Sequence, residues 1–172
     1  ERSRTPGGLP NLVELSDIKS DLQVHSDFDI ETSHDLGASS MEEIIKKAGR
    51  LKYEYLAFTE HNPSKSKHSE KQIVEILKRK REKVEQLNYS RVTKVFNSLE
   101  IDIMPDGELA VSEKGLNTLD FALVSIHSSF RSSKDEMTKR VLSALSHPKV
   151  KIFAHPTARK INERDADYKN IN

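Results

Sequence analysis

Five short apolar runs recur along the chain, and each leads into a histidine or a glutamate. The runs cover residues 22–24, 55–58, 95–99, 121–126 and 150–154, and they lead into His25, His61, Glu100, His127 and His155. Short runs with few polar residues are typical of strands buried in a parallel sheet. Helical patterns lie between them, so the sequence predicts an α/β fold with parallel strands.

The helical patterns begin at recognisable positions. Ser40 to Glu43 and Ser133 to Glu136 both have the capping-box sequence that starts helices. A longer amphipathic helix is predicted from about Glu70 to Leu87, because its apolar residues follow helical spacing. Its basic residues, Lys78 to Arg81 and Lys83, are predicted to lie on the exposed face. A solvated surface is favoured for them over a DNA-binding face.

The third apolar run is predicted to continue through Glu100 to Ile103 as one strand. Pro105 to Gly107 is a turn signal, so a short return segment is expected after it. At the N-terminus, residues 1–10 are polar and rich in glycine and proline, which indicates a linker or tail. The domain itself is predicted to cover residues 11–172.

Composition narrows the classes of function. A chain of 172 residues suits one domain, and its formal net charge of +1 gives no argument for nucleic-acid binding. Cysteine is absent, so a metal would be held by imidazole, carboxylate or water. No signal peptide is recognised, and no apolar run approaches the roughly 20 residues that span a membrane. A cytoplasmic protein is therefore expected.

The residues that follow the apolar runs indicate metal chemistry. A single histidine after a strand is usually structural, but four of the seven histidines in this chain occupy that position. In parallel α/β folds the strand ends meet at one edge, where active sites form. Imidazole and carboxylate together suit Zn²⁺, Mn²⁺ or Fe²⁺, and clustered ions can activate water for phosphoester hydrolysis. The G-x-S-x-G, Walker and dinucleotide-binding signatures are absent.

Several motifs carry a family resemblance. In chain order they are D-L-Q-V-H-S, F-T-E-H, L-E-I-D, V-S-I-H-S and A-H-P-T-A-R. Together they resemble the polymerase and histidinol phosphatase (PHP) superfamily. The similarity is greatest to the C-terminal PHP domain of bacterial and archaeal family X DNA polymerases, and it extends from about Leu9 to Arg159.

The resemblance implies a fold, a cofactor and a substrate. The fold would be a distorted (β/α)7 TIM-like barrel with up to three divalent ions, Mn²⁺ or Zn²⁺. The activity would be that of a metal-dependent phosphoesterase, a 3′→5′ exonuclease that processes DNA ends in repair through metal-activated water. The expected partners are DNA and an N-terminal polymerase domain in the same chain.

The resemblance also assigns roles to individual residues. The implied metal ligands are His25, Asp35, His61, Glu100, His127 and His155. Glu100 corresponds to the bridging carboxylate, and with His127 and His155 it forms the predicted catalytic group. His34 competes with Asp35 for the position in the loop after the first motif. Arg131 and Arg159 are predicted to contact phosphate, with a surface ion pair as the alternative reading for each.

Three departures from the family pattern keep other functions open. Gln23 replaces a histidine, Glu60 replaces an aspartate, and the chain ends before the last motif, which leaves about five of seven β/α units. A small-molecule phosphatase of the histidinol-phosphate type is one alternative, and turnover of phosphate monoesters would reveal it. The other is a non-catalytic scaffold module of a polymerase, for which bound metal and hydrolysis would both be missing.

Overall fold

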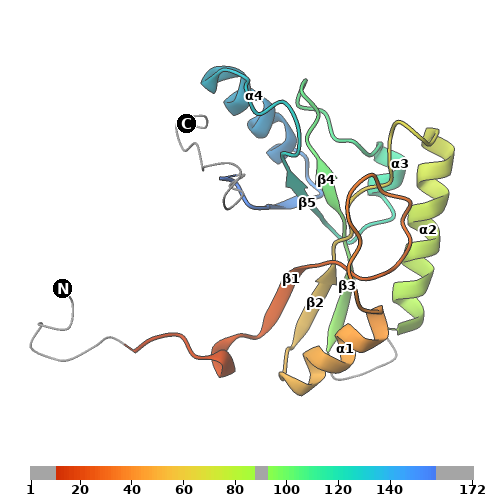
Figure 1. The fold of residues 1–172 in the computed structure, drawn as a ribbon, viewed down its shortest axis with the longest axis vertical. Coiled ribbons are helices and arrows are strands. Elements are labelled where there is room, and N and C mark those ends of the chain that lie inside the picture. Colours follow the sequence, from red (N-terminus) through yellow and green to blue (C-terminus); the bar gives the residue numbers. More distant parts are fainter. Residues whose placement is uncertain (1–10, 88–92, 158–172) are drawn as a thin grey trace, which may run out of the picture.

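The computed structural model describes residues 11–87 and 93–157, which form an α/β fold with two three-stranded parallel sheets (Figure 1). In the first sheet the order is β1 (Ser20–Val24), β2 (Tyr55–Phe58) and β3 (Lys94–Asn97). In the second it is β4 (Glu100–Asp102), β5 (Ala122–Ser125) and β6 (Val150–Phe153). Among the described strands neither sheet closes on itself. The predicted tail, residues 1–10, lies outside the described residues.

The helices are α1 (Met41–Arg50), α2 (Glu70–Leu87), α3 (Glu113–Leu116) and α4 (Lys134–Leu145), with a 3₁₀ turn at Leu15–Asp17. Both predicted capping boxes are present, because Ser40 and Ser133 each accept a hydrogen bond from the backbone three residues later. The bounds of α2 match the predicted helix. None of the helices in the described ranges is long and apolar enough to cross a membrane.

The third strand differs from its prediction. Residues 95–103 do not form one strand, because the chain leaves the first sheet after Asn97 and enters the second at Glu100. At the crossing, the amide of Ser98 donates to Phe58 in β2, at 3.0 Å. The carbonyl of Leu99 accepts from Leu123 in β5, at 2.9 Å. Consecutive residues therefore pair with different sheets, and Glu100 begins a strand instead of ending one.

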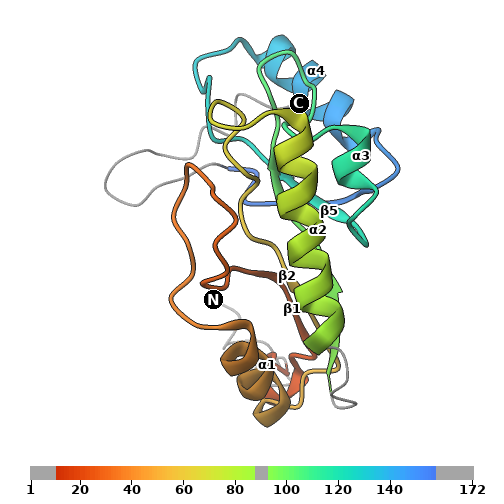
Figure 2. The same cartoon turned by 90° about the vertical axis from the view of Figure 1, so that its right-hand side faces the viewer.

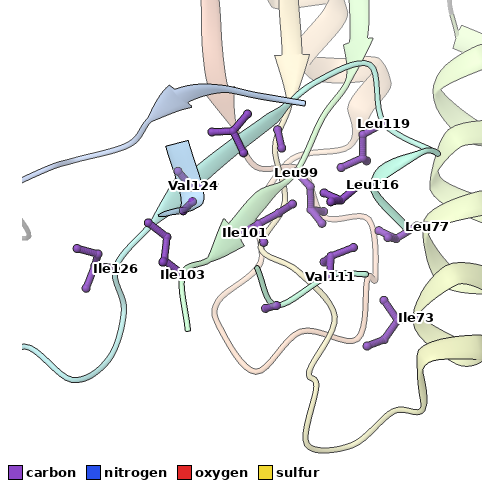
Figure 3. Packing of buried hydrophobic residues seen from close by; sticks show 14 of the residues in the cluster. Ile73, Leu77, Leu99, Ile101, Ile103, Val111, Leu116, Leu119, Val124 and Ile126 are labelled. Carbon is purple, nitrogen blue, oxygen red and sulfur yellow. The ribbon is translucent and has the colours of Figure 1, made fainter. Parts of the chain in front are cut away.

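The hydrophobic core has two clusters, and α2 packs against both. Ile73, Ile76 and Leu77 belong to the cluster around β4 and β5, whereas Val84 belongs to the cluster around β2 and β3. Figure 2 shows α2 running along both sheets. In Figure 3, Ile73 and Leu77 point from the helix toward Val111 and Leu116.

The part of α2 between the two clusters corrects a second prediction. Lys80 does not lie on the exposed face, because its side chain is fully buried. Its ammonium group donates to the carbonyl of Phe58 at 2.9 Å and to that of Ser98, and it lies 2.8 Å from a carboxylate oxygen of Glu60. The basic run therefore contains one core residue among surface residues.

Candidate metal centre

Glu100 lies at the centre of a cluster of histidines. Its side chain is only 1% exposed. Oε1 lies 2.7 Å from Nε2 of His155 and 3.3 Å from Nε2 of His127. Oε2 lies 3.3 Å from Nε2 of His25 and accepts a hydrogen bond of 2.9 Å from the side-chain amide of Gln23. One buried carboxylate thus contacts side chains from both sheets.

Within the part of the chain that the structure describes, the ligand-type side chains form three overlapping groups. They are His25, His61 and Glu100; Glu100, His127 and His155; and His34, His61 and His127. Within each group the candidate ligand atoms all lie within 4.8 Å of one another. Because Glu100, His61 and His127 each belong to two groups, ions held there would share ligands.

The loop after β1 brings His34 to the cluster. Thr32 forms an antiparallel bridge with Pro63, which places this loop against the segment after β2. The ring of His34 lies 4.5 Å from that of His61 and 4.8 Å from that of His127, measured between centroids. The sequence showed His34 only as a competitor of Asp35, because spacing in a loop does not determine which side chain points inward.

Backbone geometry at the site is constrained at two positions. At Gly37 an added Cβ would lie 2.0 Å from the carbonyl oxygen of His25, so the loop after β1 can approach the ligand strand only with glycine there. His155 has a φ of 28°, an unusual value for a residue other than glycine. Such strain is concentrated at functional sites in proteins.

A second carboxylate, Asp102, contacts two of the histidines. Oδ1 of Asp102 lies 2.6 Å from Nδ1 of His127, and Oδ2 lies 3.4 Å from Nε2 of His34. Nε2 of His127 is therefore left to face Glu100. A carboxylate behind a histidine fixes the ring and raises its basicity as a ligand. Sequence reasoning missed this role, although Asp102 follows Glu100 by two residues and shares its face of the strand.

Burial and charge shift the acid–base properties of the cluster. Burial, assisted by the neighbouring histidines, lowers the pKa of His61 to about 4 despite the opposing charge of Glu100. Burial also lowers the pKa of His127, but Asp102 and Glu100 outweigh it and raise the pKa to about 9. For Glu100, burial raises the pKa, whereas hydrogen bonds from His127, His155 and His25 hold it well below its usual range. Glu100 therefore remains ionised.

The donor set fits divalent transition metals. Imidazole and carboxylate are ligands that Zn²⁺, Mn²⁺ and Fe²⁺ accept. Buried Nδ1 atoms of His25 and His61 have no hydrogen-bond partner among the described residues, so these two rings are not satisfied by protein contacts alone. Gln23, which replaces a histidine of the family pattern, does not leave a gap, because its amide contacts Glu100.

Five of the six predicted metal ligands come together in these groups, and their roles as ligands remain a proposal. The exception is Asp35, which is exposed, whereas the neighbouring His34 lies in one of the groups. Arg131 is exposed in the loop between β5 and α4, where its predicted contact with phosphate remains a prediction. Arg159 lies outside the described residues.

Fold and site together define an α/β protein with adjoining histidine and carboxylate groups that could hold several metal ions. The family model for the PHP domain matches residues 21–165. The chain therefore belongs to the PHP domain family.

The comparison with curated proteins gives a more particular similarity. The chain is 35% identical over 154 residues to "DNA polymerase/3'-5' exonuclease PolX" of Bacillus subtilis (strain 168). The alignment covers 89% of this chain but only 26% of that protein, so the chain spans about a quarter of its relative's length. This similarity confirms the resemblance to the PHP domain of family X DNA polymerases.

Proposed function

We propose that this domain hydrolyses DNA phosphodiesters from the 3′ end, as the exonuclease domain of a family X DNA polymerase that acts in repair. The observation that carries the proposal is the buried Glu100 carboxylate, whose two oxygens face histidines of both sheets. A carboxylate in this position can bridge two ions, which is the arrangement that phosphodiester hydrolysis uses.

The proposed ligands are the residues of the three groups, with Glu100 shared between two of them. Bound Mn²⁺ or Zn²⁺ would supply activation of water and stabilisation of charge on the phosphoester oxygens. We assign the catalytic group to Glu100, His127 and His155. Asp102 holds the ring of His127 in place through Nδ1. Asp35 stays a proposed ligand beside His34, and Arg131 and Arg159 are proposed to contact the phosphates of DNA.

The proposals about substrate and partners rest on the similarity to PolX. The name of that protein combines a polymerase with a 3′–5′ exonuclease, and the matched part is about a quarter of its length. A polymerase domain in the same chain is therefore proposed as a partner, with DNA as the substrate. We also propose that residues 11–172 belong to one PHP domain and that the two sheets form part of a distorted (β/α)7 barrel. The parallel bridge between His61 and Glu100, which connects the sheets, supports this arrangement.

Replacing Glu100 tests the proposed function. Glu100→Gln keeps the size of the side chain but removes the charge that two groups share. In the full-length protein with Mn²⁺, we expect release of nucleotides from 3′ ends of single-stranded DNA to fall by more than about 100-fold. This loss is larger than the loss that follows removal of a residue that only hydrogen-bonds to a metal ligand. Glu82→Gln, the same substitution at an exposed position of α2, should leave the rate unchanged.

Two results would contradict the proposal. Undiminished, metal-dependent hydrolysis by Glu100→Gln would show that the site lies elsewhere. Rapid turnover of phosphate monoesters without hydrolysis of DNA would instead favour a small-molecule phosphatase. Metal analysis of the same preparations separates both results from a scaffold, which would contain no metal and hydrolyse neither substrate.

A further inference from the structure

A buried polar network lies directly behind one of the three groups. Its centre is Glu60, which is 1% exposed and precedes His61. Oε1 accepts hydrogen bonds from the amide and the hydroxyl of Ser26, at 3.1 and 2.5 Å, and Oε2 lies 2.8 Å from the ammonium of Lys80. Ser26 is fully buried and follows His25 directly. The carboxylate of Glu60, next to His61, therefore holds Ser26, which is next to His25.

Lys80 extends the network to the third member of the group. It donates to the carbonyl of Ser98, two residues before Glu100, and to that of Phe58, three residues before His61. Together with the ion pair to Glu60, these two hydrogen bonds surround the ammonium group with three oxygen atoms. One ammonium thus ties together the backbone before two candidate ligands.

We propose that Lys80, Glu60 and Ser26 form a positioning network for the metal group of His25, His61 and Glu100. None of the three is proposed as a ligand; they act by fixing the backbone from which the ligands extend. This inference rests on the proposed metal-dependent function. Its links reach the group of Glu100, His127 and His155 only through the shared Glu100, because the two histidines lie on the loops after β5 and β6.

Energetics support a role beyond stability. Moving a lysine and a glutamate out of water is so unfavourable that a buried ion pair seldom stabilises a fold more than well-packed apolar residues do. The contacts of this network instead fix the positions of the candidate ligands, because each contact ends within three residues of one of them. Positioning partners of metal ligands typically change metal affinity by about 10–100-fold when they are removed.

Metal titration of two variants tests the network without relying on catalysis. Ser26→Ala removes only the hydroxyl that Glu60 accepts from, and the double variant Glu60→Gln/Lys80→Met removes both buried charges together. The two charges are removed together because Lys80→Met alone would leave the Glu60 carboxylate buried without its counter-charge. All variants are made in the full-length protein. Lys78→Met is the matched control, with the same substitution at an exposed position of the same helix.

Binding of Co²⁺ followed by visible absorption, and of Mn²⁺ by calorimetry, gives the affinity and the number of sites. We expect Ser26→Ala and the double variant to bind about one ion with an affinity lowered roughly 10–100-fold. The sites that share only His61 or Glu100 with this group should lose less affinity, and the Lys78→Met control should keep wild-type affinity at every site. Circular dichroism checks that each variant is folded. Wild-type affinity and stoichiometry in both network variants would overturn the proposal.

The same titration separates this proposal from the proposed function. If the wild-type protein binds metal but does not hydrolyse DNA, the proposed function fails, and the network is still judged by its variants. If the wild-type protein binds neither metal, both proposals are overturned. An equal loss of affinity at all sites would also contradict the network, because it would indicate general loosening of the fold.

Discussion

Each of the two sheets has a buried cation beneath its candidate ligands, but the two cations are held differently. Lys80 from α2 reaches the first sheet and is paired with the carboxylate of Glu60, at 2.8 Å. Arg140 from α4 reaches the second sheet and donates to carbonyl oxygens of Ile103, Met104 and Ser128. Both side chains are almost completely buried.

The difference determines what each cation leaves behind when it is removed. Without Lys80, the Glu60 carboxylate would remain buried without its counter-charge. Without Arg140, the carbonyls of Ile103 and Ser128 would lose a donor and that of Met104 would keep the amide of Gly107, but no ion pair among the described residues would be broken. A buried unpaired charge is much more unfavourable than an unsatisfied carbonyl. The two cations therefore allow an ion pair to be compared with a set of carbonyl dipoles.

The largest expected effect follows from removing one charge of the ion pair. Lys80→Met should lower the free energy of unfolding by about 3–5 kcal/mol, because the carboxylate of Glu60 stays buried. Glu60→Gln/Lys80→Met should recover most of this loss. Urea denaturation of the wild-type protein and the variants measures both changes. If the double variant were no more stable than Lys80→Met, the ion pair would not be the source of the loss.

Arg140→Met should be less damaging than Lys80→Met. The loss of donors to the carbonyls of Ile103 and Ser128 is expected to lower the free energy of unfolding by about 1–3 kcal/mol, whereas the carbonyl of Met104 still accepts from the amide of Gly107. Lys139→Met, an exposed neighbour on the same helix, is the matched control. The same urea denaturation shows which of the two buried cations contributes more to the free energy of unfolding. A larger loss for Arg140→Met than for Lys80→Met would show that the dipoles, not the ion pair, dominate.

The sequence predicted the elements better than it predicted these contacts. Helix bounds followed from local signals, since capping boxes and apolar spacing act within a few residues. The break between β3 and β4 has no such signal, because every residue from Val95 to Ile103 is buried or half-buried and no glycine or proline interrupts the stretch. The two strands are separated only by their hydrogen bonds: Ser98 bonds to β2 of the first sheet, and Leu99 bonds to β5 of the second.

Lys80 shows that part of the missing information was present. It lies three residues after Leu77 and four before Val84, on the apolar stripe of α2. Its position within a run of lysines and arginines concealed this spacing. Spacing could not identify its partner, because Glu60 lies in the segment after β2, 20 positions earlier in the chain, and meets Lys80 only in the folded structure.

An exposed arrangement on the loop that carries His34 gives the smallest expected effect. Nε2 of His68 lies 2.8 Å from Glu31, whose other oxygen lies 3.1 Å from Arg79, the residue before Lys80. The carbonyl of Ser64 and the carboxylate of Glu31 raise the pKa of His68. His68 and Arg79 lower the pKa of Glu31. Water screens such exposed pairs, so they stabilise a fold far less than buried ones.

His68→Gln should therefore reduce stability only slightly, and the reduction should depend on pH. Because the pKa of His68 is raised on folding, its stabilisation is complete below the unfolded value of about 6.5 and is lost as the pH rises through the folded value. On the acid side it is lost as Glu31 is protonated. Urea denaturation should thus show a larger difference from wild type just below pH 6.5 than at alkaline pH, where the ring is neutral in both states. A difference independent of pH would instead assign the effect to the hydrogen bond with Ser64, which a neutral ring also makes. The stabilisation by His68 would then come from a hydrogen bond to a carbonyl, as for Arg140, and not from an ion pair.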